Sequence, residues 1–137
     1  MQIRIGNKQD EQGVRDLLAA ERALDLSGRD ADLRKIELHY FGNDGVFLVA
    51  EERQKVFGFA TAIKLSDTTC ALKRLFVRVD RRNQGAGSAL LRQVIGFARK
   101  LDYMTLSASE QSVAGDGLAL LERFGFQRAG EHLELSL

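Results

Sequence analysis

Residues 71–101 read ALKRLFVRVDRRNQGAGSALLRQVIGFARKL, and this stretch decides the fold. Its first part, 71–79, is largely apolar and predicts a strand, while apolar residues at a 3.6-residue spacing predict a helix over 86–101. Gly85 and Gly87 lie in the turn between the two. A helix that begins at such a turn presents unpaired backbone N–H groups at the positive end of its dipole. The stretch therefore predicts a binding site for an anion, and the arginines before the glycines favour a phosphate.

Composition places the chain among ordinary globular proteins. With 137 residues, 45% apolar and 28% charged, it predicts a single domain over 1–137. The formal net charge of +1 argues against nucleic acid or a membrane surface as a partner. Cys70 is the only cysteine, which excludes an internal disulfide and a cysteine-rich metal site, so no metal is expected. A reducing, cytoplasmic location suits this pattern, and neither a signal peptide nor a membrane span is predicted.

The remaining elements follow from periodicity and turn residues. Polar–apolar alternation predicts a strand over 2–6, and helical spacing predicts helices over 10–24 and 30–41. Strands over 46–51, 56–65 and 71–79 are joined by short polar segments, which predicts an antiparallel meander. A strand over 103–108 follows a helix and should lie parallel to 71–79, before a helix over 117–124 and a strand over 132–137. The order β-α-α-β-β-β-α-β-α-β predicts an α+β domain with a mixed, partly antiparallel central sheet and about four flanking helices.

The glycine turn does not fit two common phosphate motifs. The dinucleotide pattern G-x-G-x-x-G fails because its third glycine position holds Leu90, and the P-loop fails because the chain has no Gly-Lys pair. What remains is RNQGAG, residues 82–87, after a strand that ends in L-F-V. This arrangement resembles the GNAT superfamily of N-acetyltransferases, whose acetyl-CoA signature is R/Q-x-x-G-x-G/A. The later LLERFGF, residues 120–126, is similar to the family's L-Y-E-K-L-G-F, so motifs support the resemblance over 71–127 and element order supports it over 1–65.

The resemblance implies acetyl-CoA or coenzyme A as co-substrate. Residues of the turn would hold the CoA pyrophosphate, and backbone groups at the end of the preceding strand would pair with the pantetheine arm. An N–H there would polarise the thioester carbonyl. A plain tight turn is the alternative explanation of the glycines. The cofactor-binding residues so implied are Leu75, Phe76, Val77, Arg82, Asn83, Gln84, Gly85, Ala86, Gly87 and Ser88.

The usual acid–base residues of the family are missing. Lys73 stands where many members have a glutamate, Leu121 where many have a tyrosine, and Ala114 near a frequent asparagine. The catalytic acid and base are therefore open, with Glu110 and Tyr103 as candidates. Against these stand a solvated loop glutamate, a packing tyrosine, and proton transfer through water. On the second helix, Glu37 and Tyr40 are candidates for binding the acceptor, although an exposed charged face would explain them too.

Three functions stay open at this point. The first is an N-acetyltransferase that moves an acetyl group from acetyl-CoA to a primary amine of a small molecule or peptide by direct attack. The second is a non-catalytic CoA-binding regulatory domain, which the missing acid–base residues favour. The third is an unrelated α+β protein with a chance glycine turn. Members of the family often self-associate through sheet edges, so a homodimer is also left open.

Overall fold

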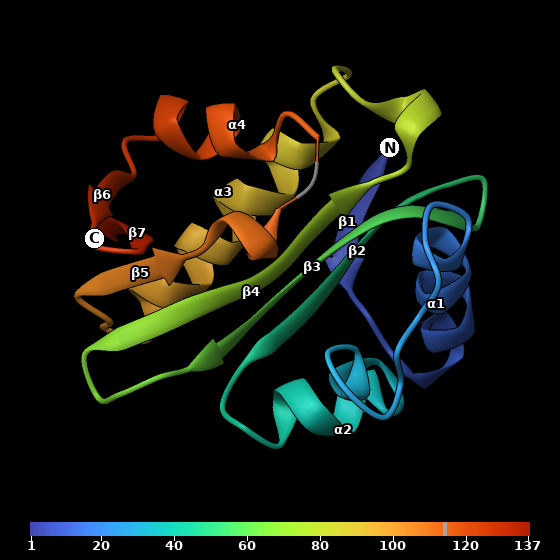
Figure 1. Ribbon diagram of the computed structural model, residues 1–137, viewed down its shortest axis with the longest axis horizontal. Coiled ribbons are helices and arrows are strands. Elements are labelled where there is room, and N and C mark those ends of the chain that lie inside the picture. The colour runs from blue at the N-terminus through green and yellow to red at the C-terminus, as the bar shows by residue number, and fades with distance from the viewer. Residues whose placement is uncertain (114) are drawn as a thin grey trace.

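The computed structural model describes residues 1–113 and 115–137 as one seven-stranded sheet with helices on both faces (Figure 1). The strand order is β1-β2-β3-β4-β5-β7-β6. The strands are β1 (Gln2–Ile5), β2 (Val46–Glu52), β3 (Lys55–Lys64), β4 (Thr69–Val77), β5 (Thr105–Ala108), β6 (Gln127–Ala129) and β7 (His132–Ser136). The α-helices are α1 (Glu11–Ala19), α2 (Ile36–Phe41), α3 (Ala86–Lys100) and α4 (Gly117–Arg123). Short 3-10 helices are η1 (Lys8–Asp10), η2 (Ala31–Leu33), η3 (Val79–Arg81) and η4 (Glu110–Ser112).

The predicted meander is confirmed. β2, β3 and β4 pair antiparallel in sequence order, with Glu52 opposite Lys55 across a two-residue connection. Arg53 and Gln54 in that connection both have positive φ, 53° and 67°. Two positive φ values give the tight hairpin turn whose twist matches that of the strands.

β4 and β5 pair in parallel, as predicted, but only at one end. Their register joins Thr69 to Thr105, Cys70 to Leu106 and Ala71 to Ser107. The connection between them runs through α3, as a parallel pair requires. β5 then ends at Ala108 while β4 continues to Val77, so the second half of β4 has no β5 residue opposite it (Figure 1).

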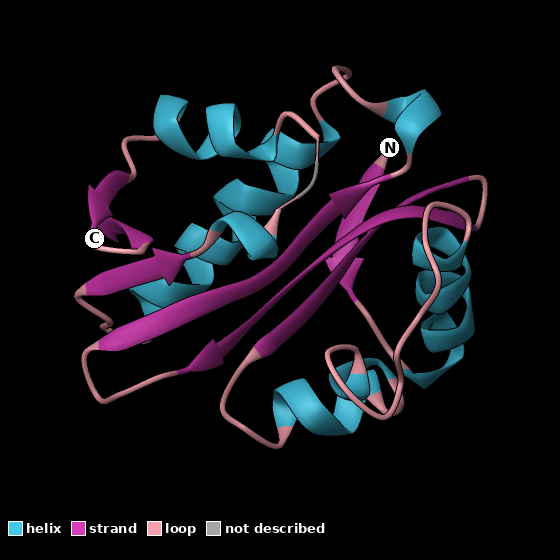
Figure 2. Cartoon of the chain, viewed as in Figure 1, coloured by secondary structure: helices cyan, strands magenta, loops and turns pink. Residues whose placement is uncertain are grey.

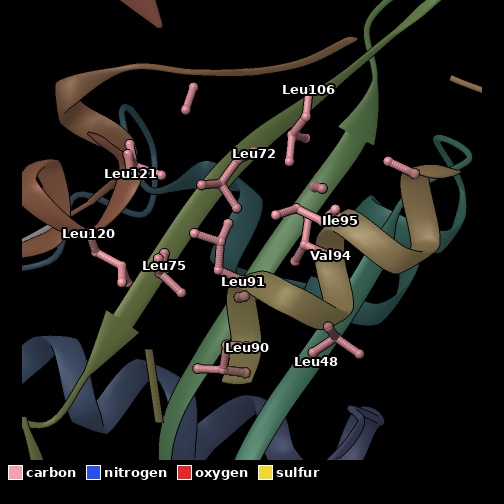
Figure 3. Packing of buried hydrophobic residues seen from close by; sticks show 14 of the residues in the cluster. Leu48, Leu72, Leu75, Leu90, Leu91, Val94, Ile95, Leu106, Leu120 and Leu121 are labelled. Atoms are coloured by element: carbon pink, nitrogen blue, oxygen red, sulfur yellow. The ribbon is translucent and has the colours of Figure 1, made fainter. Parts of the chain in front are cut away.

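Two hydrophobic cores lie on the two faces of the sheet, because side chains alternate along each strand. On one face Leu75 and Val77 of β4 pack with α3 and α4, where leucines from several elements interdigitate (Figure 3). On the other face Phe76 of β4 packs with Leu17 of α1 and Ile36 of α2. β4 is thus covered by different helices on its two faces.

The structure corrects several predicted boundaries. The helix predicted over 10–24 ends at Ala19, and the helix predicted over 30–41 is divided into η2 and α2. The strand predicted over 103–108 begins at Thr105. A strand that was not predicted, β6, pairs with β7 across Gly130, whose φ is +71°. The long connection between α1 and α2 is mostly loop (Figure 2), and it folds around the buried carboxylate of Asp30, a contact that local periodicity does not encode.

None of the described helices is both long and apolar enough to cross a membrane.

Candidate functional site

A pocket, here called the α3 pocket, opens at the start of α3, between the end of β4 and α4. Seven of the ten residues implied for cofactor binding line it. The other three do not line it. Phe76 packs on the opposite face of the sheet, and the exposed Gln84 accepts a hydrogen bond from Arg81. Ala86, the first residue of α3, is buried in the core. The seven that line it are Leu75, Val77, Arg82, Asn83, Gly85, Gly87 and Ser88.

The turn before α3 leaves several backbone N–H groups without a partner within the helix. Gly85 precedes the helix with φ +92°, a conformation that glycine adopts without the Cβ penalty of other residues. The first bond of the helix runs from the Ala89 N–H to the Gly85 carbonyl, at 3.0 Å. The N–H groups of Ala86, Gly87 and Ser88 come before it and have no partner within the helix. With a 15-residue helix behind them, these groups suit an anion.

Both arginines of the turn are already bound within the protein. Arg82 donates through Nε to the Val77 carbonyl at 2.8 Å and through a second nitrogen to Glu21 at 3.1 Å. Arg81 forms an ion pair with Glu52 at 2.7 Å and stacks over the ring of Phe57. The strongest free donors of the turn are therefore the backbone N–H groups rather than these guanidinium groups.

The position of Arg82 also depends on Gly115. A Cβ atom at Gly115 would lie 2.9 Å from an Arg82 nitrogen, closer than side chains tolerate. Gly115 has φ +58°, again suited to glycine. Its missing side chain leaves room for the Arg82 guanidinium between α1 and the α4 region.

The open edge of β4 presents backbone groups from alternate residues. The Arg78 N–H donates to the Phe57 carbonyl at 2.8 Å, which makes these two residues a hydrogen-bonded antiparallel pair. Because such pairs alternate, the Phe76 backbone also faces β3, whereas the backbones of Leu75 and Val77 face the open edge. Of the three residues expected to pair with a ligand through their backbones, only Leu75 and Val77 are so placed.

Part of this edge is covered by the chain that follows β5. Leu75 forms a parallel bridge with Val113, and the Ser112 hydroxyl donates to the Leu72 carbonyl at 2.9 Å. Ser112 also accepts from the Ser109 N–H at 3.1 Å. η4 therefore closes the space between β4 and β5 and leaves the region around Val77 as the accessible part of the edge.

A second pocket lies on the other side of β4. It is formed by the end of α1, the middle of β4 and the chain around η4, and Leu75 lines both pockets. Its polar lining comes from Ser112 and from four larger side chains that the sequence did not single out: Glu21, Arg22, Arg74 and Gln111. The Arg82–Glu21 ion pair joins the two pockets, because Arg82 lines the first and Glu21 the second.

A buried ionic network fixes the two arginines of the second pocket. Asp30 is fully buried and accepts two hydrogen bonds from Arg22, at 2.8 and 2.9 Å, and one from Arg74 at 3.1 Å. Arg74 also binds both oxygens of Asp32, at 2.7 and 2.8 Å. The Arg22 hydrogen bonds hold the pKa of the Asp30 carboxyl well below its usual range, although burial opposes them. The carboxylates of Asp30 and Asp32 neutralise the charges of these two arginines, so the second pocket carries little net charge.

Comparisons with known proteins fit this arrangement. A family model described as an acetyltransferase (GNAT) domain matches residues 43–128, more than half of the chain. This chain belongs to the GNAT superfamily. The resemblance inferred from the RNQGAG turn is thereby confirmed. Human N-acetyltransferase 8 is 33% identical over 106 residues, and N-acetylaspartate synthetase of Danio rerio is 32% identical over 108 residues.

These alignments cover 73% and 77% of this chain but only 47% and 38% of the relatives. The GNAT domain described here thus spans about half or less of their length. Among solved structures, an acetyltransferase of the GNAT family from Staphylococcus aureus superposes with a TM-score of 0.81 at 21% identity, covering 99% and 98% of the two chains. A putative acetyltransferase from Salmonella typhimurium, solved with acetyl-CoA, gives 0.79 at 20% identity, covering 99% and 93%. These likenesses confirm the fold class.

The acid–base candidates lie outside both pockets of the GNAT domain. Glu110 is paired with Arg128 on the surface. Tyr103 is packed in the core beside α3, where burial raises its pKa. Lys73, at the family's glutamate position, is exposed, and Leu121, at its tyrosine position, is fully buried in the core. Among the described residues, none of these four side chains lines the α3 pocket or the second pocket.

The acceptor candidates on α2 both contact other parts of the protein. Glu37 accepts a hydrogen bond from the Lys8 N–H, away from both pockets. Tyr40 is fully buried, and its hydroxyl donates to Asp32 beneath the second pocket. Burial, together with the Asp32 charge, raises the Tyr40 pKa well above its usual range. Tyr40 thus supports the ionic network and has no surface to offer a ligand.

The side chains of the second pocket were missed because they belong to distant segments. Arg74 had one available signal: it is a charged residue in an apolar strand, at a position that alternates onto the same face as Phe76. Glu21 and Arg22 follow α1 within a stretch that the sequence assigned to a helix. Their role depends on where α1 ends, which local spacing did not predict.

Among the residues described, no group of histidine, cysteine, aspartate and glutamate side chains is arranged to hold a metal ion.

Proposed function

We propose that this GNAT domain is an N-acetyltransferase that moves an acetyl group from acetyl-CoA to a primary amine of a small molecule or peptide. The observation that carries the proposal is the α3 pocket, where free N–H groups of Gly87 and Ser88 adjoin the open edge of β4. Solved neighbours support acetyl-CoA or CoA as the cofactor. The PaiA N-acetyltransferase of Thermoplasma acidophilum was solved with coenzyme A, and a phosphinothricin acetyltransferase of Sinorhizobium meliloti with acetyl-CoA.

In this proposal each region of the site has one task. The N–H groups at the start of α3 bind the CoA pyrophosphate, and the accessible edge of β4 at Val77 aligns the pantetheine arm. The thioester then lies near Leu75, which both pockets share. A backbone N–H at this edge stabilises the negative charge that develops on the carbonyl oxygen. The acceptor enters from the second pocket, on the side of Glu21.

The transfer needs no covalent enzyme intermediate. The neutral amine nitrogen attacks the thioester carbon, the C–S bond breaks, and CoA leaves as a thiolate. The amine proton passes to water in the second pocket, and a proton from water neutralises the thiolate. This route requires no side chain to act as acid or base. It is therefore compatible with the placement of Glu110 and Tyr103 outside the two pockets.

Thermal unfolding tests cofactor binding directly. A ligand present at about 100 times its dissociation constant stabilises the folded state by about 2.7 kcal/mol. For a domain of this size we expect acetyl-CoA and CoA to raise Tm by about 5–10 °C. No shift at millimolar acetyl-CoA would overturn the proposal.

Thiol release tests the reaction. Free CoA should appear when the protein, acetyl-CoA and a panel of amines are combined, faster than without protein. The panel should contain polyamines, amino acids and peptides with free N-termini. Stabilisation by CoA without thiol release from any amine would favour the alternative of a non-catalytic CoA-binding domain. The homodimer and the cytoplasmic location stay predictions from the sequence.

The Arg82–Glu21 pair gives a prediction about cofactor affinity. Replacing Glu21 by glutamine frees the positive charge of Arg82 beside the α3 pocket. An exposed ion pair is worth about 0.5 kcal/mol, so we expect CoA to bind about two- to threefold more tightly at low salt. The gain should shrink at 0.5 M salt. Titration calorimetry measures it, and weaker binding would show instead that the pair holds the pocket in shape.

Arg82→Ala is the partner experiment. It removes both the charge and the bond to the Val77 carbonyl, and we expect CoA affinity to fall more at low salt than at high salt. A loss that is independent of salt would assign Arg82 a packing role only.

A further inference from the structure

Three arginines line the α3 pocket, and only one of them is uncommitted. Arg81 is paired with Glu52, and Arg82 with Glu21. Arg123, in the last turn of α4, is exposed and has no ion pair or side-chain hydrogen bond among the described residues. It is therefore the guanidinium in this pocket that can take a ligand anion without giving up a protein partner.

The packing of α4 against α3 places Arg123 beside the turn glycines. A Cβ atom at Gly87 would lie 3.3 Å from a terminal carbon of Leu120, so Leu120 is in contact with the start of α3. Arg123 comes three positions later on α4 and so lies on the same helix face, about 4.5 Å further along the axis. Helical side chains lean toward the helix N-terminus, which directs Arg123 back toward Leu120 and the pocket.

The pocket has a carboxylate as well, but at its other end. Asp116 lines the pocket just before the first residue of α4, and Arg123 is the last residue of that helix. The two are therefore about 10 Å apart along the axis. At that distance an exposed carboxylate does not neutralise Arg123, so the α4 end of the pocket keeps its positive charge.

Coenzyme A carries three phosphates, and the turn accounts for two of them. The backbone N–H groups of Gly87 and Ser88 suit the 5′-pyrophosphate. The third phosphate is a monoester on the ribose 3′ oxygen, one sugar away, and carries nearly two negative charges at neutral pH. We propose that Arg123 binds this 3′-phosphate and makes the domain discriminate coenzyme A from 3′-dephospho-CoA. This inference rests on the proposed function, since it assumes that CoA occupies the α3 pocket.

Titration calorimetry with two ligands and three proteins tests the proposal. CoA and 3′-dephospho-CoA are titrated into the wild type, Arg123→Gln and Arg99→Gln at about 50 mM salt. Glutamine keeps the helix propensity and most of the length of arginine. Arg99 is the matched control because it is also exposed, and it lies at the far end of α3, outside the pocket.

The expected result is a preference that depends on Arg123 alone. A charge-assisted contact at an exposed site should make the wild type bind CoA about tenfold more tightly than 3′-dephospho-CoA. Arg123→Gln should reduce this ratio to below about twofold by weakening CoA, with 3′-dephospho-CoA unchanged. Arg99→Gln should keep the wild-type ratio.

Two results would overturn the inference while leaving the proposed function intact. One is a wild type that binds both nucleotides equally. The other is an Arg123→Gln protein that loses affinity for both by the same factor, which would make Arg123 a general contact. A wild type that binds neither nucleotide would overturn the inference together with the proposed function, so the two failures are distinguishable.

Discussion

Replacing Gly87 by valine is expected to abolish CoA binding while leaving the domain folded. The first atom of the new side chain would lie 3.3 Å from Leu120 and 3.9 Å from Val77, inside the α3 pocket. The two methyl groups would then stand in front of the N–H groups proposed to bind the pyrophosphate. We expect a loss of at least roughly 100-fold in affinity, measured by calorimetry with CoA.

The control for this variant is the same substitution elsewhere in the same helix. Gly96 of α3 is exposed, and a Cβ atom there would meet no atom within 4 Å. Gly96→Val should therefore bind CoA like the wild type. Gly85→Val should also lose CoA, but Gly85 has φ +92°, so valine there would strain the turn as well. Gly87→Val with unchanged CoA affinity and a native circular dichroism spectrum would refute the pyrophosphate assignment.

Replacing Asp30 by asparagine is expected to cost about 3 kcal/mol of folding free energy. Asp30 is fully buried and accepts hydrogen bonds from Arg22, Arg74 and the Asp25 N–H. Removing one partner of a buried ionic group leaves the remaining charges uncompensated. This loss is a large part of the 5–15 kcal/mol that stabilises a typical domain. Urea unfolding measures it as a lower midpoint with an unchanged slope.

Asp67→Asn is the matched control. Asp67 forms an ion pair with Lys64 at 3.2 Å, but its side chain is 96% exposed. An exposed pair contributes at most about 1 kcal/mol, so this variant should unfold close to the wild type. Equal losses in Asp30→Asn and Asp67→Asn would show that the buried network does not stabilise the domain.

The same network predicts how stability depends on pH. Asp30 has a folded pKa below its ordinary value, because Arg22 donates two hydrogen bonds to its charged form. A carboxyl with a depressed folded pKa contributes stability that is fully present above its unfolded pKa, about 3.9, and is lost as pH falls. The wild type should therefore lose stability below about pH 5, and Asp30→Asn should lose less over the same interval. Parallel curves for the two proteins would contradict the assignment.

The α3 pocket could be predicted from sequence because its parts are local. The turn, the free N–H groups and the helix come from one continuous stretch around Gly85 and Gly87, and their geometry follows from glycine conformation and helix periodicity. The RNQGAG sequence also distinguished this turn from the dinucleotide-binding motif and from the P-loop. The meander and the parallel crossover were predicted for the same reason, since connection length and order fix them.

The detailed contacts of the same residues could not be predicted. Arg82 lines the α3 pocket, where a phosphate is expected, but its hydrogen bond to Glu21, which is 61 positions away in the sequence, was not predicted. The backbone N–H and carbonyl of Phe76 were expected to pair with the cofactor, but its pairing with Phe59 directs both groups toward β3. Tyr40 was expected at an acceptor surface, but Asp32 and the core enclose it. In each case a long-range partner decided the outcome.

The fold class and the family could be inferred from sequence because they depend on short-range patterns within 71–101 and on element order, and the anion site predicted at the same turn rests on those patterns too. The side chains around the second pocket are known from the folded structure alone, because they come from segments far apart in the sequence. Arg74 meets Asp32 across 42 positions, and Ser112 meets Leu72 across 40. Such contacts arise from the balance of burial and charge over the whole sheet, and no local spacing encodes them.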